Sequence, residues 1–115
     1  MYYTYMLRCA DGTIYSGIAA SLENRMKVHF CGGPGGAKYV MSRGALRLEC
    51  FWTSPDKGSA SKLEYRLKQL SRDRKEALIS GEIELEDVFS EKLECQAYSR
   101  GNADGESLKE FRRNV

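Results

Sequence analysis

Two tyrosines, an arginine and a histidine near the start of the chain have side chains that could act together on a phosphate. Tyr5 and Tyr15 occupy successive strand-like stretches, and Arg25 and His29 follow in a helix-like stretch. A planar guanidinium binds phosphate oxygens through paired hydrogen bonds, and phenol and imidazole groups can move protons. If these side chains converge, their types suit a site for a phosphodiester. The alternative is that the tyrosines only pack in the core.

A β-hairpin must position the two tyrosines. The stretch from Tyr2 to Cys9 alternates and is rich in aromatic residues, and Thr13 to Ile18 has the pattern of its partner strand. The turn between them is "ADG", which can form a two-residue loop or the three-residue loop Ala10–Gly12. The three-residue loop suits this sequence, because it places a glycine where the left-handed conformation is needed.

The choice of loop decides which face each phenol occupies. A two-residue loop turns the two phenols to opposite faces of the sheet. The three-residue loop sets Tyr5 opposite Gly17 and Tyr15 opposite Leu7, so both phenols share one face. In this register Gly17 is expected to leave open space over the backbone, which a ligand could occupy.

The helix after the hairpin places polar side chains beside an apolar stripe. Ser21 is a plausible N-cap, and Leu22, Met26 and His29 recur at helical spacing with Arg25 on the same face. An unpaired buried guanidinium is costly, so Arg25 must find an anion or a position at the rim. The structural alternative is a rim arginine paired with an acid and a histidine satisfied at the core edge.

A second helix carries a carboxylate next to its apolar stripe. The stretch from Ala60 to Leu70 has leucines at helical spacing, and Glu64 borders that stripe. Carboxylates beside a core are unusual unless they are paired or bind a cation. The alternative role for Glu64 is an ion pair with Lys68, four residues further along the helix.

The other expected elements complete a mixed α and β pattern. We expect a third strand over 47–54 after a short helix that ends at Gly44, and a loop over 54–59. A helix capped by Ser71 and stopped by Gly81 follows. Beyond it, the pattern indicates a possible short helix over 82–89, a loop over 98–107 and a terminal helix over 107–114.

Composition indicates one soluble domain. The chain has 115 residues, and no apolar run approaches the roughly 20 residues that span a bilayer. Without a signal-peptide pattern, we expect a cytoplasmic protein with reduced cysteines and no membrane association. The first 80 residues carry a net charge of +6 and the remainder −4, and this asymmetry is compatible with a polyanionic partner.

The spacing of these residues resembles the motif pair of the GIY-YIG nuclease superfamily. "YTY" at Tyr3–Tyr5 is followed ten residues later by "YSG" at Tyr15–Gly17. The further matches are Arg25, His29 and Glu64. The stretch "GAKYVMSR" is similar to the small standalone bacterial members of the superfamily. The first motif lacks its glycine and isoleucine, a mild departure.

The resemblance implies an α+β fold, with a central three-stranded antiparallel sheet flanked by helices. The nuclease domain would span residues 1–81, and residues 82–115 would form an acidic, partly helical extension that packs on the domain or trails it. The implied activity is hydrolysis of DNA phosphodiesters with one Mg²⁺ or Mn²⁺ ion, in repair or recombination.

Each matching residue takes a role from the resemblance. Tyr5 would act as general base or orient the attacking water, and Tyr15 would position water or phosphate. Arg25 would hold the scissile phosphate, and His29 would assist activation of the nucleophile. Glu64 would be the single protein ligand of the metal ion.

Further residues are expected to contact DNA. They frame the proposed site: Gly17, Lys38, Arg43, Arg66, Lys68 and Arg72. Glu76 stands where several superfamily members have an asparagine. The polar contact that this asparagine would make is therefore not assigned to a residue of this chain. The expected DNA is branched, nicked or single-stranded, and a protein partner could supply targeting. The alternative is an inactive nucleic-acid-binding or protein-interaction module on the same fold.

Overall fold

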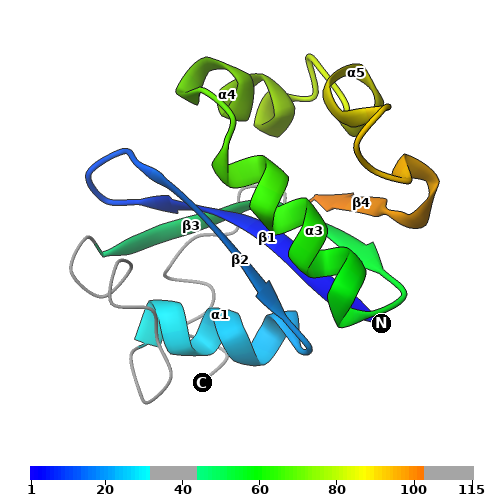
Figure 1. Cartoon of the computed structure of the whole chain (residues 1–115). Coiled ribbons are helices and arrows are strands. Elements are labelled where there is room, and N and C mark those ends of the chain that lie inside the picture. Colours follow the sequence, from blue (N-terminus) through cyan, green and yellow to red (C-terminus); the bar gives the residue numbers. More distant parts are fainter. Residues whose placement is uncertain (32–43, 103–115) are drawn as a thin grey trace.

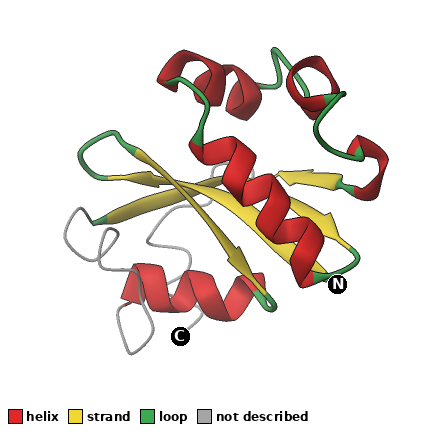
Figure 2. Ribbon diagram, in the orientation of Figure 1, coloured by secondary structure: helices red, strands yellow, loops and turns green. Residues whose placement is uncertain are grey.

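A computed structural model describes residues 1–31 and 44–102 of the chain. The elements, in chain order, are β1 (Tyr2–Cys9), β2 (Ile14–Ala19), α1 (Leu22–Cys31), β3 (Ala45–Ser54), α3 (Lys57–Lys68), α4 (Arg72–Ser80), α5 (Leu85–Phe89), the short 3₁₀ helix η1 (Cys95–Ala97) and β4 (Ser99–Asn102). The fold is α+β, as the sequence predicts, with helices on both sides of an antiparallel sheet (Figures 1 and 2).

The sheet has a fourth strand where the sequence indicated a loop. The strand order is β2-β1-β3-β4, so β1 and β3 form the centre and β2 is an edge strand. In β4, Gly101 pairs with Phe51 and Arg100 pairs with Trp52. A methyl group at Gly101 would lie 2.3 Å from the Phe51 ring, so this glycine lets the ring cover the strand. A strand of four residues is too short to show an alternation of apolar and polar residues. Its pairing depends on residues far away in the sequence, so the sequence pattern did not predict it.

The hairpin adopts the three-residue loop. The amide of Gly12 donates to the carbonyl of Cys9 at 2.9 Å, and Gly12 has a φ of 88°. The register sets Tyr5 opposite Gly17 and Tyr15 opposite Leu7, as predicted from "ADG". Because side chains alternate along a strand, both phenols lie on the same face of the sheet.

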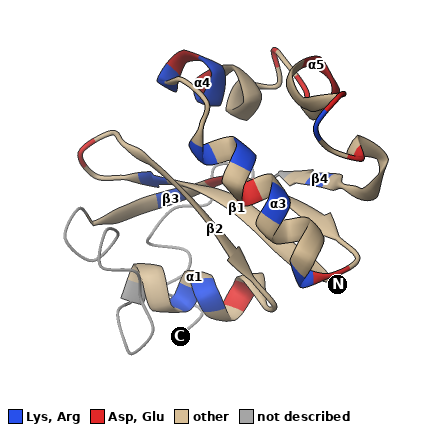
Figure 3. Cartoon of the chain, viewed as in Figure 1, with Lys and Arg blue, Asp and Glu red and all other residues tan. Residues whose placement is uncertain are grey.

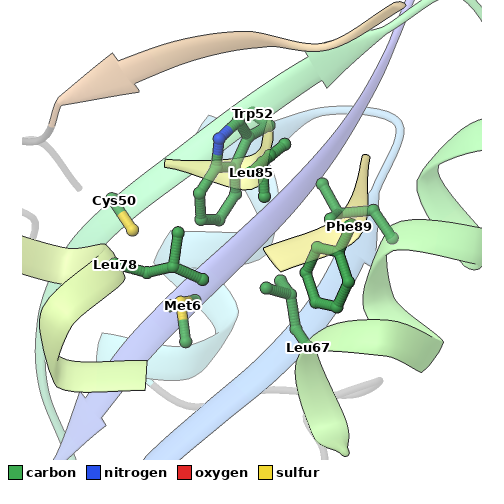
Figure 4. Packing of buried hydrophobic residues seen from close by; sticks show 8 residues of the cluster. Met6, Cys50, Trp52, Leu67, Leu78, Leu85 and Phe89 are labelled. Carbon is green, nitrogen blue, oxygen red and sulfur yellow. The ribbon is translucent and has the colours of Figure 1, made fainter. Parts of the chain in front are cut away.

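Each face of the sheet has its own helices and its own apolar cluster. On one side, α1 contributes Met26 and Phe30 to a cluster with Tyr5, Leu7 and Leu48. The other side is covered by α3, α4 and α5 (Figure 1), and its cluster is drawn in Figure 4. The members of that second cluster are Met6, Cys50, Trp52, Leu63, Leu67, Leu78, Leu85 and Phe89.

Side-chain caps set where the helices begin. The Asp56 carboxylate accepts from the amide of Ser59 at 2.7 Å, so α3 begins at Lys57, inside the stretch that the sequence indicated as a loop. The expected start at Ala60 was therefore too late, because a cap can extend a helix beyond its apolar stripe. Ser71 caps α4 and Gly81 ends it in the left-handed conformation, as predicted.

The residues after Gly81 pack on the same core as the preceding helices. Leu85 and Phe89 of α5 are buried in the second cluster. The Arg100 guanidinium lies 5.5 Å from the Trp52 ring and donates to the Leu78 and Ile79 carbonyls at the end of α4. This one side chain therefore ties β4 to both the sheet and α4.

Some expectations fall on residues that the structure does not describe. They are the short helix before Gly44, the terminal helix over 107–114, and the DNA-contact residues Lys38 and Arg43. In the described part of the chain, no helix combines the length and the apolar character needed to cross a membrane.

Candidate active site

Tyr5 and His29 form the centre of the candidate site. Tyr5 comes from the central strand β1 and is 1% exposed, and His29 comes from the last turn of α1. A hydrogen bond of 2.7 Å joins the Tyr5 hydroxyl oxygen to His29 Nε2. The predicted convergence of the hairpin and the helix is therefore present, and it brings together a phenol and an imidazole that can exchange a proton.

Tyr15 completes a group of three rings. Its centroid lies 6.3 Å from that of Tyr5 and 5.8 Å from that of His29, and Tyr5 and His29 are 5.6 Å apart. Tyr15 belongs to the edge strand β2 and is only partly buried. This phenol therefore sits between the buried pair and the open edge of the sheet.

Gly17 serves a purpose different from the one expected. A methyl group at this position would lie 2.5 Å from the Tyr5 hydroxyl and 2.9 Å from the Tyr15 ring. The space over Gly17 is thus filled by the tyrosines, and the expectation of open space for a ligand was wrong. Strand pairing alone could not show this, because the direction of the Tyr5 side chain decides it. Gly17 allows the Tyr5 ring to lie on the neighbouring strand.

Burial keeps the central pair uncharged. The pKa of His29 falls to about 4, first because burial disfavours the imidazolium and second because Arg25 is nearby. Burial likewise raises the pKa of the Tyr5 phenol, and the neighbouring Tyr15 adds to this rise. His29 is therefore neutral at pH 7 and able to accept a proton through one ring nitrogen. His29 Nδ1 is buried with no hydrogen-bond partner among the described residues.

Arg25 and Glu64 act on the phenols from helices on different faces of the sheet. The charge of Arg25, on α1, lowers the pKa of both Tyr5 and Tyr15, although burial raises each pKa more strongly. The charge of Glu64, on α3, raises both values. These opposing effects locate both charges near the tyrosines. The site therefore extends around the edge strand β2, from α1 to α3.

Glu64 also forms the ion pair that was its alternative role. Its carboxylate lies 3.4 Å from Lys68 Nζ, and the Glu64 side chain is 23% exposed. An exposed i,i+4 pair of this kind contributes only about 0.3–0.5 kcal/mol to stability. The ion pair therefore leaves the carboxylate available to another cation.

The donor set suits a metal ion that keeps most of its waters. In residues 1–31 and 44–102, no group of three or more His, Cys, Asp or Glu side chains could hold a metal. A site for zinc built from protein ligands is thus absent from the described part. Mg²⁺ needs only one or two carboxylates when waters and substrate phosphates complete its shell, and Glu64 fits that requirement.

The predicted DNA-contact residues on α3 and α4 have intramolecular partners. The Arg66 guanidinium lies 5.3 Å from the Tyr65 ring centroid, and Lys68 pairs with Glu64. Arg72 donates to the Gly12 carbonyl at 2.9 Å, which ties α4 to the hairpin turn. The helices α3 and α4, which carry these residues, cover the same side of the sheet, and Figure 3 shows blue segments on both.

Glu76 belongs to an ion-pair network that was not predicted from the sequence. Arg8, on β1, donates to the Glu76 carboxylate at 2.5 and 2.6 Å and to Glu49 at 2.8 and 3.1 Å. This bonding to Arg8 lowers the pKa of Glu76. Since Arg8 alternates with Leu7 along β1, it points to the face opposite the phenols. The sequence feature that could have indicated this network is Arg8, a single arginine in a strand whose other residues are mostly buried.

Comparison with known proteins identifies the family to which this chain is similar. The sequence profile of the GIY-YIG catalytic domain matches residues 1–77. The UPF0213 protein BH0048 of Halalkalibacterium halodurans is 43% identical over 79 residues, which cover 69% of this chain and 82% of that protein. A UPF0213 protein of Clostridium perfringens is 37% identical over 93 residues, which cover 81% of this chain and 98% of the relative.

One solved structure is also similar. The solution NMR structure of the UPF0213 protein BH0048 from Bacillus halodurans has 43% sequence identity and a TM-score of 0.45. The match covers 70% of this chain and 84% of the solved chain.

Gly17→Ala should displace Tyr5, because the added methyl group would overlap its hydroxyl. We expect a loss of about 1–3 kcal/mol in the free energy of unfolding, measured by urea denaturation. Gly58→Ala is the matched control, since a methyl group there meets only the Asp56 carboxylate at 3.5 Å. Equal stability of both variants would show that the close approach does not constrain position 17.

His29 should titrate far below a free imidazole, with a midpoint of about 4. The chain has one histidine, so its imidazole proton signals in NMR spectra report this value without ambiguity. Between pH 6.5 and 4 the unfolded chain binds a proton that the folded chain does not, so stability should fall as the pH falls. His29→Gln should remove that part of the pH dependence. A midpoint near 6.5 would contradict the buried, neutral imidazole.

Proposed function

Because the chain belongs to the GIY-YIG catalytic domain family, which indicates a nuclease-type function, we propose that it is a metal-dependent DNA endonuclease. The reaction is hydrolysis of a phosphodiester bond. The observation that carries the proposal is the 2.7 Å hydrogen bond between the Tyr5 hydroxyl oxygen and His29 Nε2. A phenol needs a proton acceptor to become a base at neutral pH, and this imidazole is one.

Tyr5 and His29 would together remove a proton from the attacking water. As the Tyr5 phenol passes its proton to His29, the phenolate takes one from the water, whose oxygen attacks phosphorus. The P–O bond to the leaving nucleotide then breaks. Arg25 favours the phenolate, because its positive charge lowers the pKa of Tyr5. Tyr15, at the edge of the same ring group, would orient the water or a phosphate oxygen.

Arg25 and Glu64 would hold the substrate between α1 and α3. A guanidinium binds two oxygens of one phosphate, which suits Arg25 to the scissile group. A Mg²⁺ or Mn²⁺ ion at Glu64 would supply positive charge that stabilises the phosphoryl oxygens and the leaving oxygen. When the ion binds, Lys68 would release the Glu64 carboxylate. The Lys68 ammonium group would then be available to a DNA phosphate.

The Glu64–Lys68 ion pair also favours a second candidate function. If that pair is the only role of Glu64, the chain would bind nucleic acid without cleaving it. The intact set of two tyrosines, arginine and histidine is the argument against this candidate, since a binding module has no need for the buried Tyr5–His29 bond. Cleavage assays with and without a divalent ion separate the two functions.

Glu64→Ala should abolish metal-dependent cleavage while leaving the fold intact. We expect the rate to fall at least about 10²-fold on flap, nicked or single-stranded DNA that the wild type cuts in Mg²⁺ or Mn²⁺. The matched control is Glu23→Ala, which removes a carboxylate from another i,i+4 pair, with Lys27, on α1. Comparable rates for Glu64→Ala and wild type would exclude Glu64 as the metal ligand.

Tyr5→Phe should separate chemistry from packing. The ring stays and one hydrogen bond is lost, so stability should change by about 1–2 kcal/mol, whereas cleavage should fall about 10²-fold or more. Tyr98→Phe is the control, because Tyr98 also donates a hydrogen bond, to the Ser59 carbonyl at 2.6 Å. Full cleavage activity of Tyr5→Phe would mean that this phenol packs and does not react.

A further inference from the structure

An exposed aromatic ring stands next to the proposed metal ligand. The large hydrophobic side chains that are exposed in the described ranges are Met1, Leu46 and Tyr65, and Tyr65 is the aromatic one, at 59% exposed. It follows Glu64 directly on α3 and lies away from the buried residues of that helix, Ala60, Leu63 and Leu67. The hydrophobic core does not explain a tyrosine at this position.

Positive charge surrounds this ring. The Arg66 guanidinium lies 5.3 Å from its centroid. Lys62 and Lys68 stand three residues before and after Tyr65, so helical geometry places them beside it on the exposed side. The basic residues of α3 outnumber its single acid, Glu64, and Figure 3 shows blue segments along this helix. Lys68 also reaches the candidate site, because its Nζ lies 3.4 Å from the Glu64 carboxylate.

A ring framed by cations matches a nucleotide in two ways. Bases stack on aromatic side chains whatever their sequence, and lysine and arginine neutralise the flanking phosphates. The basic frame favours a polyanion over an apolar protein surface. In a duplex both faces of each base are covered by neighbouring bases, so a surface tyrosine can stack only on a base that is unpaired or at an end.

We propose that Tyr65, held by Arg66, is a stacking platform for an unpaired DNA base beside the phosphate that is cleaved. Lys62 and Lys68 contact the phosphates on either side of that base. The substrate class is therefore DNA with a single-stranded segment at the site. This inference rests on the proposed function for the identity of the neighbouring site, but the binding it describes needs no cleavage.

The test measures binding of the whole chain in EDTA, where no metal-dependent cleavage occurs. The probes are a short single-stranded oligonucleotide and a long blunt duplex that contains the same sequence and whose two ends are a small fraction of its binding sites, each followed by fluorescence anisotropy. Tyr65→Phe keeps the ring, and Tyr65→Leu keeps an apolar side chain without a π face. Leu46→Ala is the control, because it alters exposed apolar surface on β3.

We expect Tyr65→Leu to bind the single strand about tenfold more weakly, and Tyr65→Phe and Leu46→Ala to match the wild type. Duplex affinity should be the same for all four proteins. A single strand that contains 2-aminopurine should lose fluorescence on binding to wild type and Tyr65→Phe, because stacking quenches it. The quenching should be much smaller with Tyr65→Leu.

Three results would overturn the platform: unchanged single-strand affinity of Tyr65→Leu, an equal loss on duplex, or no DNA binding by the wild type. Cleavage of the same oligonucleotides in Mg²⁺ or Mn²⁺ is measured in parallel. A wild type that stacks the base but cuts nothing would refute the nuclease proposal and leave the platform standing. If the wild type cleaves the DNA and Tyr65→Leu binds the single strand as tightly as the wild type does, the platform is refuted and the nuclease proposal stands.

Discussion

The contact of the Tyr5 hydroxyl with His29, directly above Gly17, is the constraint on which the candidate site depends. It joins three segments: the central strand β1, the edge strand β2 and the helix α1. Any side chain at position 17 would push the phenol away from the imidazole. A one-residue slip of the hairpin would move the phenol to the other face of the sheet. The position of the phenol is thus set by backbone pairing as much as by its own packing.

The same burial that holds this pair also determines its chemistry. Taking a phenol and an imidazole out of water disfavours their charged forms, so the resting site is neutral at its centre and charged at its rim. Arg25 and Glu64 provide opposite charges from two helices, and Tyr15 lies between them at the sheet edge. A phosphate that approaches β2 would meet these rim charges before it meets the buried pair. Under the proposed function, the substrate would lie at this edge, where solvent and metal ions would have access.

The sequence predicted the parts of this site that local rules control. The "ADG" turn was sufficient for the register, and the helical spacing of Met26 and His29 was sufficient for the face that α1 buries. What sequence patterns could not predict depends on side-chain direction and on distant partners. The Tyr5 ring fills the space over Gly17, Arg8 binds acids from β3 and α4, and β4 pairs with β3. None of these contacts leaves a periodic signal in its own segment.

The clamp formed by Arg100 has a consequence for how the chain folds as it is synthesised. Trp52, the end of α4 and β4 are distant in sequence, and Arg100 is the last of them to be made. Until α5 and β4 are made, the sheet lacks one edge strand, and Leu85 and Phe89 are missing from the second cluster, whose complete packing Figure 4 shows. The two tyrosines and α1 need none of these late residues. The hairpin, α1 and β3 can therefore pack before α5 and β4 are synthesised, and the second cluster closes only when those last residues are available.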